Sequence, residues 1–510
     1  MLLIILFALS LMVSAITIRT GISLSHSFGI VDHPSEHKQH TASTPFVGGL
    51  GIFFALIVAL RITDYFQLSS DIRYMWMELA ALAIFVTGFA DDIWRLDYKV
   101  RFLVQAAVAS VMALWGGVVL LDLGSLLSSR PFELGMLALP FTVFATIGVI
   151  NALNMIDGID GLSGSLSLVS LLLIAIATFV AGRETYLALI VVLMGGVTGF
   201  LYYNLRRGSR RRAAVFLGDN GSMLLGFLFS WVLIDLTQGE DRAMTPVTAL
   251  WIIAIPLMDA VGVMIRRLYY RHSPFHPDRN HLHHLFMRAG FRTQDIVYVI
   301  SIIQLAFGSV GLIGLYLDVP EPWMLAGFVG AFMIYCYLIV RPWRFVPALR
   351  RLHARLELTS ADCRGVFIGN YPPRDAQRFI RMLVEGLGPR DDYELCVYES
   401  RQEDRGERFL YAAIKLFMEE DEISVSGIRH LVDTFKKQFA GYPAVQVRQF
   451  INRNSQNDRR VHDKPIVEDF RNADRRSKHG KTLIYKSHGD DAWVGDLLKL
   501  YKNKLRISTR

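Results

Sequence analysis

Long apolar runs recur through the first two thirds of this chain and predict a bundle of membrane-spanning helices. A helix needs about 20 mainly apolar residues to cross the hydrocarbon core of a bilayer, and it satisfies its own backbone hydrogen bonds in lipid. We therefore expect an all-α polytopic membrane bundle of about eleven transmembrane helices over residues 1–341. The predicted spans lie near 1–18, 45–63, 74–90, 101–121, 136–150, 162–181, 185–205, 213–234, 245–265, 296–317 and 322–341.

The pattern changes near Arg341. Residues 342–510 contain no spanning run and are rich in charged side chains. Short strand-like segments alternate there with amphipathic helix-like segments, which predicts a cytosolic C-terminal domain of the α/β or α+β class. GVFIGN (365–370) has a glycine-rich turn but no complete nucleotide fingerprint, so a dinucleotide site is not expected. The strand-like segments are 365–370, 393–399 and 481–487, and the helix-like segments are 374–387, 427–441 and 491–505.

Composition supports a membrane protein. Of the 510 residues, 52% are hydrophobic and only 20% are charged, which is rare for a soluble protein of this size. The first apolar run has no Lys or Arg before it and no small-residue cleavage site, so we expect a retained span and not a signal peptide. Three cysteines are too few for a disulfide framework.

The charges of the loops predict the orientation. Lys and Arg concentrate in alternate loops, including RRGSRRR (206–212) and a second group between 266 and 292. Because loops rich in Lys and Arg stay in the cytosol, we expect the N-terminus outside and the C-terminus in the cytosol. RRGSRRR is explained by anchoring near anionic lipid, with steering of a phosphate substrate as the alternative. The opposite loops hold only Arg73, Arg130, Arg183 and Arg242.

Four polar islands interrupt the apolar background. This orientation, which depends on Lys and Arg alone, places all four at cytosolic ends of spans or in cytosolic loops. Their convergence predicts a site assembled from several helices. The islands are Asp91–Asp92, NALNMIDGIDGLSGS (151–165), FLGDNGS (216–222) and HPDRNHLHHLF (276–286).

The carboxylates of these islands suit a hard cation. Asp157 and Asp160 are three residues apart, which in a helix would put both on one face, able to hold a divalent cation or a proton. Asn151 and Asn154 add neutral oxygens one turn earlier. At the start of a span, Asp219 could ligate Mg²⁺ while nearby backbone amides face a phosphate. Taken alone, Asp91–Asp92 is equally well explained as the end of a span.

The histidine island allows two interpretations. Histidines at 281, 283 and 284 could bind zinc. The neighbouring Arg279 and the oxygen-rich islands instead favour a phosphate and hard-cation site, with the histidines as hydrogen-bond donors to an anionic substrate.

Together, these motifs resemble the polyprenyl-phosphate N-acetylhexosamine-1-phosphate transferases, also classed as glycosyltransferase family 4. The likeness covers about residues 1–340 and rests on GFADDIWRLDYKVRFLVQ, NALNMIDGIDGLSGS, FLGDNGSMLLG and PDRNHLHHLF, in that order. It implies transfer of a sugar 1-phosphate from a UDP-sugar to undecaprenyl phosphate, with release of UMP. It also implies Mg²⁺, or Mn²⁺ as a substitute. The histidine segment is similar to the branch that uses UDP-GlcNAc or related UDP-N-acetylhexosamines.

The resemblance also implies roles for individual residues. Asn154 and Asp219 would hold the metal, and Asp157 would act in catalysis beside it. Asp91 and Asp92 would act near the lipid phosphate, one of them as a base or metal partner. The implied ligands of the nucleotide sugar are Asp160, Arg279, His281, His283 and His284. Spacing alone does not assign the base.

The expected function is therefore the first membrane step of lipid-linked glycan synthesis, for O-antigen, capsule or a cell-wall polymer, in a bacterial inner membrane. The alternative is a secondary transporter with carboxylate cation sites at the cytosolic face. Transporter sites, however, usually lie near the midplane between two repeated halves. We expect a downstream glycosyltransferase to dock on residues 342–510, homo-oligomers as an option, and no nucleic acid partner.

Overall fold

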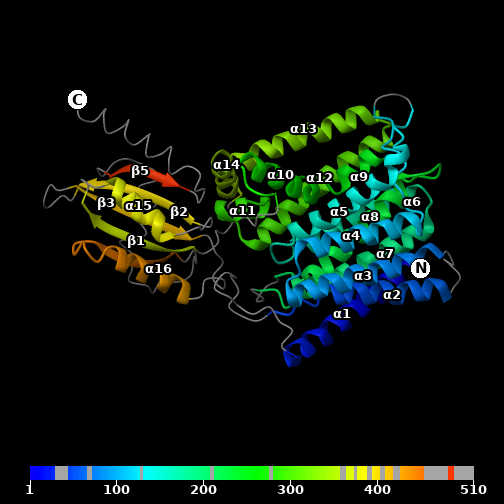
Figure 1. Cartoon of the computed structure of the whole chain (residues 1–510), viewed down its shortest axis with the longest axis horizontal. Coiled ribbons are helices and arrows are strands. Elements are labelled where there is room, and N and C mark those ends of the chain that lie inside the picture. The colour runs from blue at the N-terminus through cyan, green and yellow to red at the C-terminus, as the bar shows by residue number, and fades with distance from the viewer. Residues whose placement is uncertain are drawn as a thin grey trace. The chain divides into compact units, whose positions relative to one another are not determined.

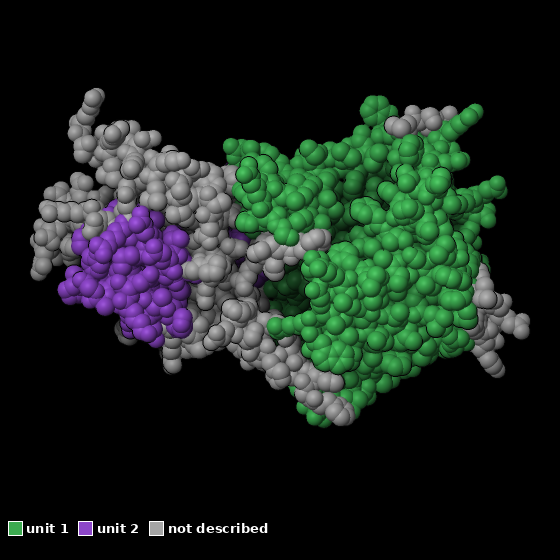
Figure 2. All heavy atoms as spheres, viewed as in Figure 1, with its two compact units in different colours: residues 1–33, 43–283, 293–345 green, residues 34–42, 284–292, 346–510 purple. Residues whose placement is uncertain are grey.

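The computed structural model divides the chain into two compact units, which we describe separately (Figure 2). The first contains residues 1–33, 43–283 and 293–345, and the second contains 34–42, 284–292 and 346–510. The structure describes residues 1–28, 44–65, 72–126, 130–206, 212–274, 280–356, 363–372, 376–387, 393–401, 408–416, 425–452 and 481–487.

The first unit is a helical bundle (Figure 1). Each of the eleven predicted runs coincides with a helix or, for 245–265, with a pair of helices. The helices are α1 (Leu2–Phe28), α2 (Gly48–Tyr65), α3 (Ile72–Trp94), α4 (Tyr98–Leu114), α5 (Ala138–Ile156), α6 (Leu162–Val180), α7 (Glu184–Asn204), α8 (Gly218–Thr237), α9 (Pro246–Ile252), α10 (Ala254–Tyr269), α12 (Thr293–Tyr316) and α13 (Glu321–Val340), with a short 3-10 helix at Gly135–Leu137.

Within the described residues, seven helices are long and apolar enough to cross a membrane, or eight if α9 and α10 form one bent span. The protein is therefore mostly helical with several membrane-capable helices, as the apolar pattern predicts. α2, α3 and α4 are shorter or more polar than the others, so a total of eleven spans stays a prediction. α8 is buried along nearly its whole length and packs against α3 and α5.

The run at 245–265, predicted as one span, is bent by 82° between α9 and α10. Pro256 explains the break, because a proline ring clashes with the carbonyl four residues earlier, here that of Ile252. The freed Ile252 carbonyl accepts hydrogen bonds from the Ser170 hydroxyl at 2.8 Å and from the Gln304 side-chain amide. The Oε1 atom of Gln304 in turn accepts a hydrogen bond from the Ile255 N–H at 2.9 Å. Side chains of α6 and α12 thus satisfy the broken backbone inside the bundle.

The second unit contains a five-stranded antiparallel sheet in the order β4-β1-β3-β2-β5. Its strands are β1 (Cys363–Tyr371), β2 (Tyr393–Arg401), β3 (Arg408–Leu416), β4 (Gln446–Asn452) and β5 (Lys481–Ser487). Two helices, α15 (Ala376–Leu387) and α16 (Val425–Gln438), share one apolar core with the sheet. In sequence, α11 (Leu282–Ala289) and α14 (Pro342–Arg355) cross the boundary between the units.

This arrangement belongs to the α+β class, because an antiparallel sheet carries its helices on one face. The predicted segments at 365–370, 393–399, 481–487, 374–387 and 427–441 coincide with β1, β2, β5, α15 and α16. β3 and β4 were not predicted from the sequence, and the helix predicted at 491–505 lies outside the described residues.

Candidate active site

Asp92, at the end of α3, is bound to the start of α8. Its carboxylate accepts hydrogen bonds from the backbone N–H groups of Asp219 and Asn220 at 2.9 and 3.1 Å, and from the Asn220 side-chain amide at 2.6 Å. The first N–H groups of a helix have no partner within the helix, so Asp92 caps α8 from another element. This approach needs Gly88, where a Cβ atom would lie 2.5 Å from the Asn220 Cα atom.

The island at 151–165 contacts the island at 216–222 through one side-chain amide. The Asn154 side chain on α5 donates to Asp219 Oδ1 at 2.6 Å and to the Ser222 hydroxyl at 3.0 Å. Asn151, one turn earlier, donates to Gln105 Oε1 at 2.8 Å and so joins α5 to α4. Asn154 thus orients the Asp219 carboxylate, which has both Asp91 and Asp92 as close neighbours.

Asp157 lies in the loop that follows α5. The helix ends at Ile156, so the expectation that Asp157 and Asp160 share one helical face is wrong. Asp157 itself leaves the helical conformation, at φ −77° and ψ +55°, and Gly161, in a left-handed conformation at φ +85°, precedes the start of α6. Burial and the nearby carboxylates of Asp219, Asp92 and Asp160 raise the pKa of Asp157 well above its usual value.

Asp160 and Asp91 each have a cationic partner. Asp160 accepts from Arg206 Nε at 2.7 Å and from the Ala213 N–H at 3.0 Å, which fixes both ends of the 206–213 segment. Buried Asp91 accepts from Arg101 Nη1 at 2.6 Å and from the Leu96 N–H at 2.7 Å. Their negative charges are therefore largely compensated, whereas Asp157 and Asp219 face other carboxylates.

The histidine island folds back onto the Asp157 loop. His281 Nδ1 lies 2.8 Å from Asp259 Oδ2 on α10, and the ring of His281 stacks on that of His283 at a centroid distance of 5.8 Å. His283 covers Gly158, where a Cβ atom would lie only 2.4 Å from His283 Nε2. Burial and the adjacent His281 lower the pKa of His283 to about 3, so this ring is neutral.

Two predicted residues are not placed in this cluster. Arg279 lies outside the described residues, and His284 belongs to the second unit. Of RRGSRRR, only Arg206 and Arg212 fall within the described ranges. The ion pair with Asp160 gives Arg206 a structural role besides that of a topology anchor.

The donor atoms suit a hard cation. Among the described residues, no three His, Cys, Asp or Glu side chains form a ready-made metal-binding group. Mg²⁺ does not require one, since it usually keeps several waters and binds one or two carboxylates together with substrate phosphates. Asp157 and Asp219 are the carboxylates whose charges are least compensated, and both offer oxygen. The residues present therefore fit Mg²⁺, and Asn154 fits as an orienting neighbour through its bond to Asp219.

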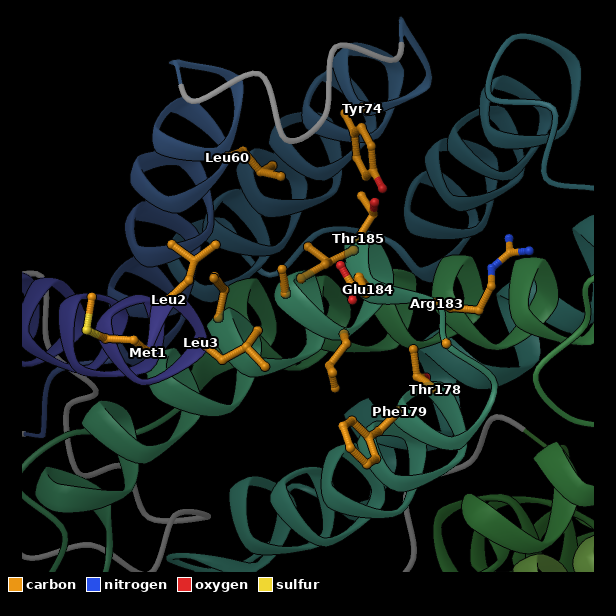
Figure 3. Close-up of a pocket in the computed structure, with 15 residues that line it drawn as sticks. Met1, Leu2, Leu3, Leu60, Tyr74, Thr178, Phe179, Arg183, Glu184 and Thr185 are labelled. Atoms are coloured by element: carbon orange, nitrogen blue, oxygen red, sulfur yellow. The ribbon is translucent and has the colours of Figure 1, made fainter.

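A cavity of about 420 Å³ lies at the other end of the same helices (Figure 3). Its lining includes Leu2 near the start of α1, Tyr74 near the start of α3 and Phe179 near the end of α6. Tyr74 and Asp91 are separated along α3 by about 25 Å, at 1.5 Å per residue. This mainly apolar cavity is therefore separate from the carboxylate cluster.

The comparisons with known proteins match this arrangement. A profile of glycosyl transferase family 4 matches residues 74–237, a range that contains the first three islands. Undecaprenyl-phosphate alpha-N-acetylglucosaminyl 1-phosphate transferase from Escherichia coli O157:H7 is 38% identical over 329 residues, covering 64% of this chain and 88% of that protein. The chain belongs to glycosyl transferase family 4.

Two further relatives bear the same name. The protein from Yersinia pestis is 38% identical over 335 residues, covering 66% of this chain and 90% of its own length. The protein from Haemophilus influenzae is 37% identical over 332 residues, covering 65% of this chain and 92% of its own length. The resemblance inferred from the motifs is therefore confirmed.

Several site residues were missed from the sequence. Asp259 is a fully buried carboxylate that contacts His281, accepts from the Leu282 N–H at 2.8 Å and accepts from the Tyr335 hydroxyl. A signal was present, because a lone acidic residue within an apolar span usually has a function or a specific partner. Asn204 was also missed; it binds the Gly161 N–H at 2.6 Å and the Val215 carbonyl at 2.8 Å.

Proposed function

We propose that this protein transfers GlcNAc 1-phosphate from UDP-GlcNAc to undecaprenyl phosphate and releases UMP, as the first membrane step of lipid-linked glycan synthesis. The main support is the junction of Asp92, Asn154 and Asp219, which joins three motifs of the family at adjacent helix ends. The names of its relatives point to the same acceptor and sugar. Family membership also favours a transferase over a secondary transporter.

The reaction brings together two anionic substrates, so charge compensation is its main demand. We propose that Asp219 and Asp157 hold Mg²⁺, with Asn154 orienting Asp219. When bound, Mg²⁺ would offset the negative charge of the diphosphate and the lipid phosphate. Asp92 supports the site by holding the start of α8 in place. His281, aligned by Asp259, and His283, which stacks on His281, would bind the nucleotide sugar together with Asp160, Arg279 and His284.

We further propose direct attack of the lipid phosphate oxygen on the phosphorus that bears the sugar. No Ser/His or Cys/His nucleophile pair occurs among the islands. A phosphate monoester has a second pKa of about 6, so undecaprenyl phosphate arrives largely ionised and needs orientation more than deprotonation. None of the three predicted catalytic carboxylates is free to take up a remaining proton, since Asp157 is a proposed Mg²⁺ ligand. Asp92 already accepts three hydrogen bonds, and Asp91 is paired with Arg101.

The decisive experiment incubates purified protein with Mg²⁺, undecaprenyl phosphate and a panel of UDP-sugars. We expect UMP release and a lipid-linked GlcNAc diphosphate, identified by mass spectrometry. No turnover of any UDP-N-acetylhexosamine would refute the proposed reaction. A phospho-aspartyl enzyme formed with UDP-GlcNAc alone would replace direct attack by a two-step route.

We also propose the bacterial inner membrane as the location, with eleven spans, the N-terminus outside and residues 342–510 in the cytosol as a docking domain for a downstream glycosyltransferase. The asymmetry of Lys and Arg among the loops supports this orientation. In sealed inside-out vesicles, a C-terminal tag should be digested by external protease. Deletion of the residues after about 350 should lower glycan flux in cells more than sugar transfer in vitro; equal flux would refute docking.

A further inference from the structure

Helix α13 runs along the edge of the bundle and is mostly exposed (Figure 1). Only 11% of its apolar stretch is buried, against at least 22% in the other six long membrane-capable helices that the structure describes. Met333 and Ile334 are more than half exposed. Its 20 residues measure about 30 Å, the thickness of the hydrocarbon core of a bilayer. Trp323 near its start and Tyr337 near its end are exposed, as is typical of aromatic side chains at the two membrane surfaces. The end of α13 is therefore expected among lipid headgroups.

A fixed turn follows α13. The Arg341 N–H donates to the Tyr337 carbonyl at 3.2 Å, and the Arg344 N–H donates to the Arg341 carbonyl at 3.0 Å. From α10, the Tyr270 hydroxyl donates to the Val340 carbonyl at 3.1 Å. The backbone between α13 and the first turn of α14 is thus held by hydrogen bonds, and it directs the Arg344 side chain back toward α13.

Two guanidinium groups meet at the side chain of Tyr337. Arg344 Nη1 donates to the Tyr337 hydroxyl at 2.6 Å. The guanidinium carbon of Arg341 lies 4.9 Å from the centre of the Tyr337 ring, and its Nη1 atom lies 3.5 Å from the same hydroxyl. Among the residues that the structure describes, neither guanidinium has a carboxylate partner. We call Arg341 and Arg344 the arginine pair; its two positive charges are not compensated.

Two simpler explanations account for only part of this arrangement. A cation at the C-terminus of a helix is stabilised by the helix dipole, and cytosolic arginines fix the orientation of a span. Neither effect requires two like charges to meet at one exposed ring, where they repel each other. An anion between them would remove that repulsion.

The position of the arginine pair identifies the anion. At the end of a lipid-exposed helix, the abundant anions are the phosphates of phospholipids. Guanidinium groups bind phosphate oxygens through several N–H donors at once. A zwitterionic headgroup would bring its own ammonium group toward the two arginines, so charge complementarity favours a lipid with a net negative headgroup, such as phosphatidylglycerol.

We propose that the arginine pair, held by Tyr337, binds the phosphate of an anionic phospholipid whose acyl chains lie along the exposed side of α13, over Met333 and Ile334. This site is independent of sugar transfer and would stand if the proposed transferase reaction failed.

The test uses the full-length protein in nanodiscs of phosphatidylcholine that contain a trace of a photoreactive phospholipid with a diazirine in its acyl chain. After irradiation, the label on the peptide with Met333 and Ile334 is measured by mass spectrometry. We expect the phosphatidylglycerol probe to label this peptide at least about tenfold more than the matched phosphatidylcholine probe. The double variant Arg341→Gln/Arg344→Gln should abolish this preference.

Three variants make the result specific. Arg341→Lys/Arg344→Lys keeps both charges and should retain most of the preference. Tyr337→Phe removes the hydroxyl that orients Arg344 and should reduce the preference about threefold. The matched control is Arg19→Gln/Arg292→Gln, which removes two exposed arginines elsewhere and should leave the preference unchanged.

Competition distinguishes the phospholipid from other sources of phosphate. Unlabelled phosphatidylglycerol should displace the probe, whereas inorganic phosphate should not. Equal labelling by the two probes, or an unchanged preference in Arg341→Gln/Arg344→Gln, would overturn the proposal. Stronger displacement by undecaprenyl phosphate than by phosphatidylglycerol would also overturn it, because the arginine pair would then belong to the acceptor site.

Discussion

The carboxylate of Asp92 lies 2.9 Å from the backbone nitrogen of Asp219 and accepts its hydrogen bond. Asp92 therefore holds in place the start of α8, the helix that carries Asp219. This relationship separates two functions that the acidic cluster combines. Asp92 fixes the geometry of α8, and Asp219 offers a carboxylate whose remaining neighbours are mostly acidic.

Replacing Asp92 by alanine should destabilise the junction of α3 and α8. The N–H groups of Asp219 and Asn220 would lose their acceptor in a partly buried site, at a cost of about 1–3 kcal/mol. We expect a lower melting temperature in detergent and a large loss of transfer activity. Asp92→Asn retains one acceptor oxygen and should recover part of the stability. If Asp92→Ala melts like the parent while losing activity, Asp92 acts directly on substrate.

Asp219→Asn, in contrast to Asp92→Ala, should reduce activity without reducing stability. Asparagine is similar in size, so the fold should persist, but the negative charge that binds a cation is lost. We expect kcat to fall on the order of 10²–10³-fold and the Mg²⁺ concentration for half-maximal rate to rise. The matched control is Asp235→Asn, near the other end of α8, which weakens the partly exposed pair with Arg73 and the hydrogen bond with Tyr186, both remote from the carboxylate cluster. Comparable loss in the two variants would count against a metal role.

Much of this site was predictable because chemistry and spacing are local properties of a sequence. The islands, their common side and the family all followed from short motifs and loop charges. The contacts of each carboxylate could not be predicted, because partners such as Arg101 for Asp91 and Arg206 for Asp160 are set by tertiary packing. The assumed helix through Asp157 and Asp160 failed because α5 ends at Ile156, and the spacing of the two residues does not reveal that the backbone of Asp157 leaves the helical conformation.

The sheet was less predictable. β1, β2 and β5 stood out as apolar strands, whereas RFLYAAIKL at 408–416 and QVRQFIN at 446–452 became recognisable only through pairing with β1 and β2. The stacking of Phe367 on Tyr411 is likewise a property of strand order, which the sequence pattern does not specify. An antiparallel neighbour can come from any later segment of suitable length.

The raised pKa of Asp157 predicts a dependence on pH. The folded state holds this proton more tightly than the unfolded state, so its contribution to stability is complete below the ordinary carboxyl pKa of 3.8 and is lost as pH rises through the raised value. Metal-free protein in EDTA should therefore lose stability as pH increases from about 4. Mg²⁺ competes with the proton, so its stabilising effect should grow over the same range. Asp157→Asn should flatten both trends; an unchanged pH profile would contradict this assignment.

The contact between Asp259 and His281 predicts effects on stability and on the KM for the nucleotide sugar. Asp259→Ala would leave His281, the Leu282 N–H and the Tyr335 hydroxyl without their shared acceptor in a fully buried site, which should cost about 3–5 kcal/mol. Tyr335→Phe removes one of those bonds and should cost only about 1 kcal/mol. If Asp259 aligns His281 for the nucleotide sugar, Tyr335→Phe should raise the KM for UDP-GlcNAc more than it lowers kcat, and leave the KM for undecaprenyl phosphate unchanged. A rise in both KM values would indicate a general loosening of α10, and thus a purely structural role for this buried carboxylate.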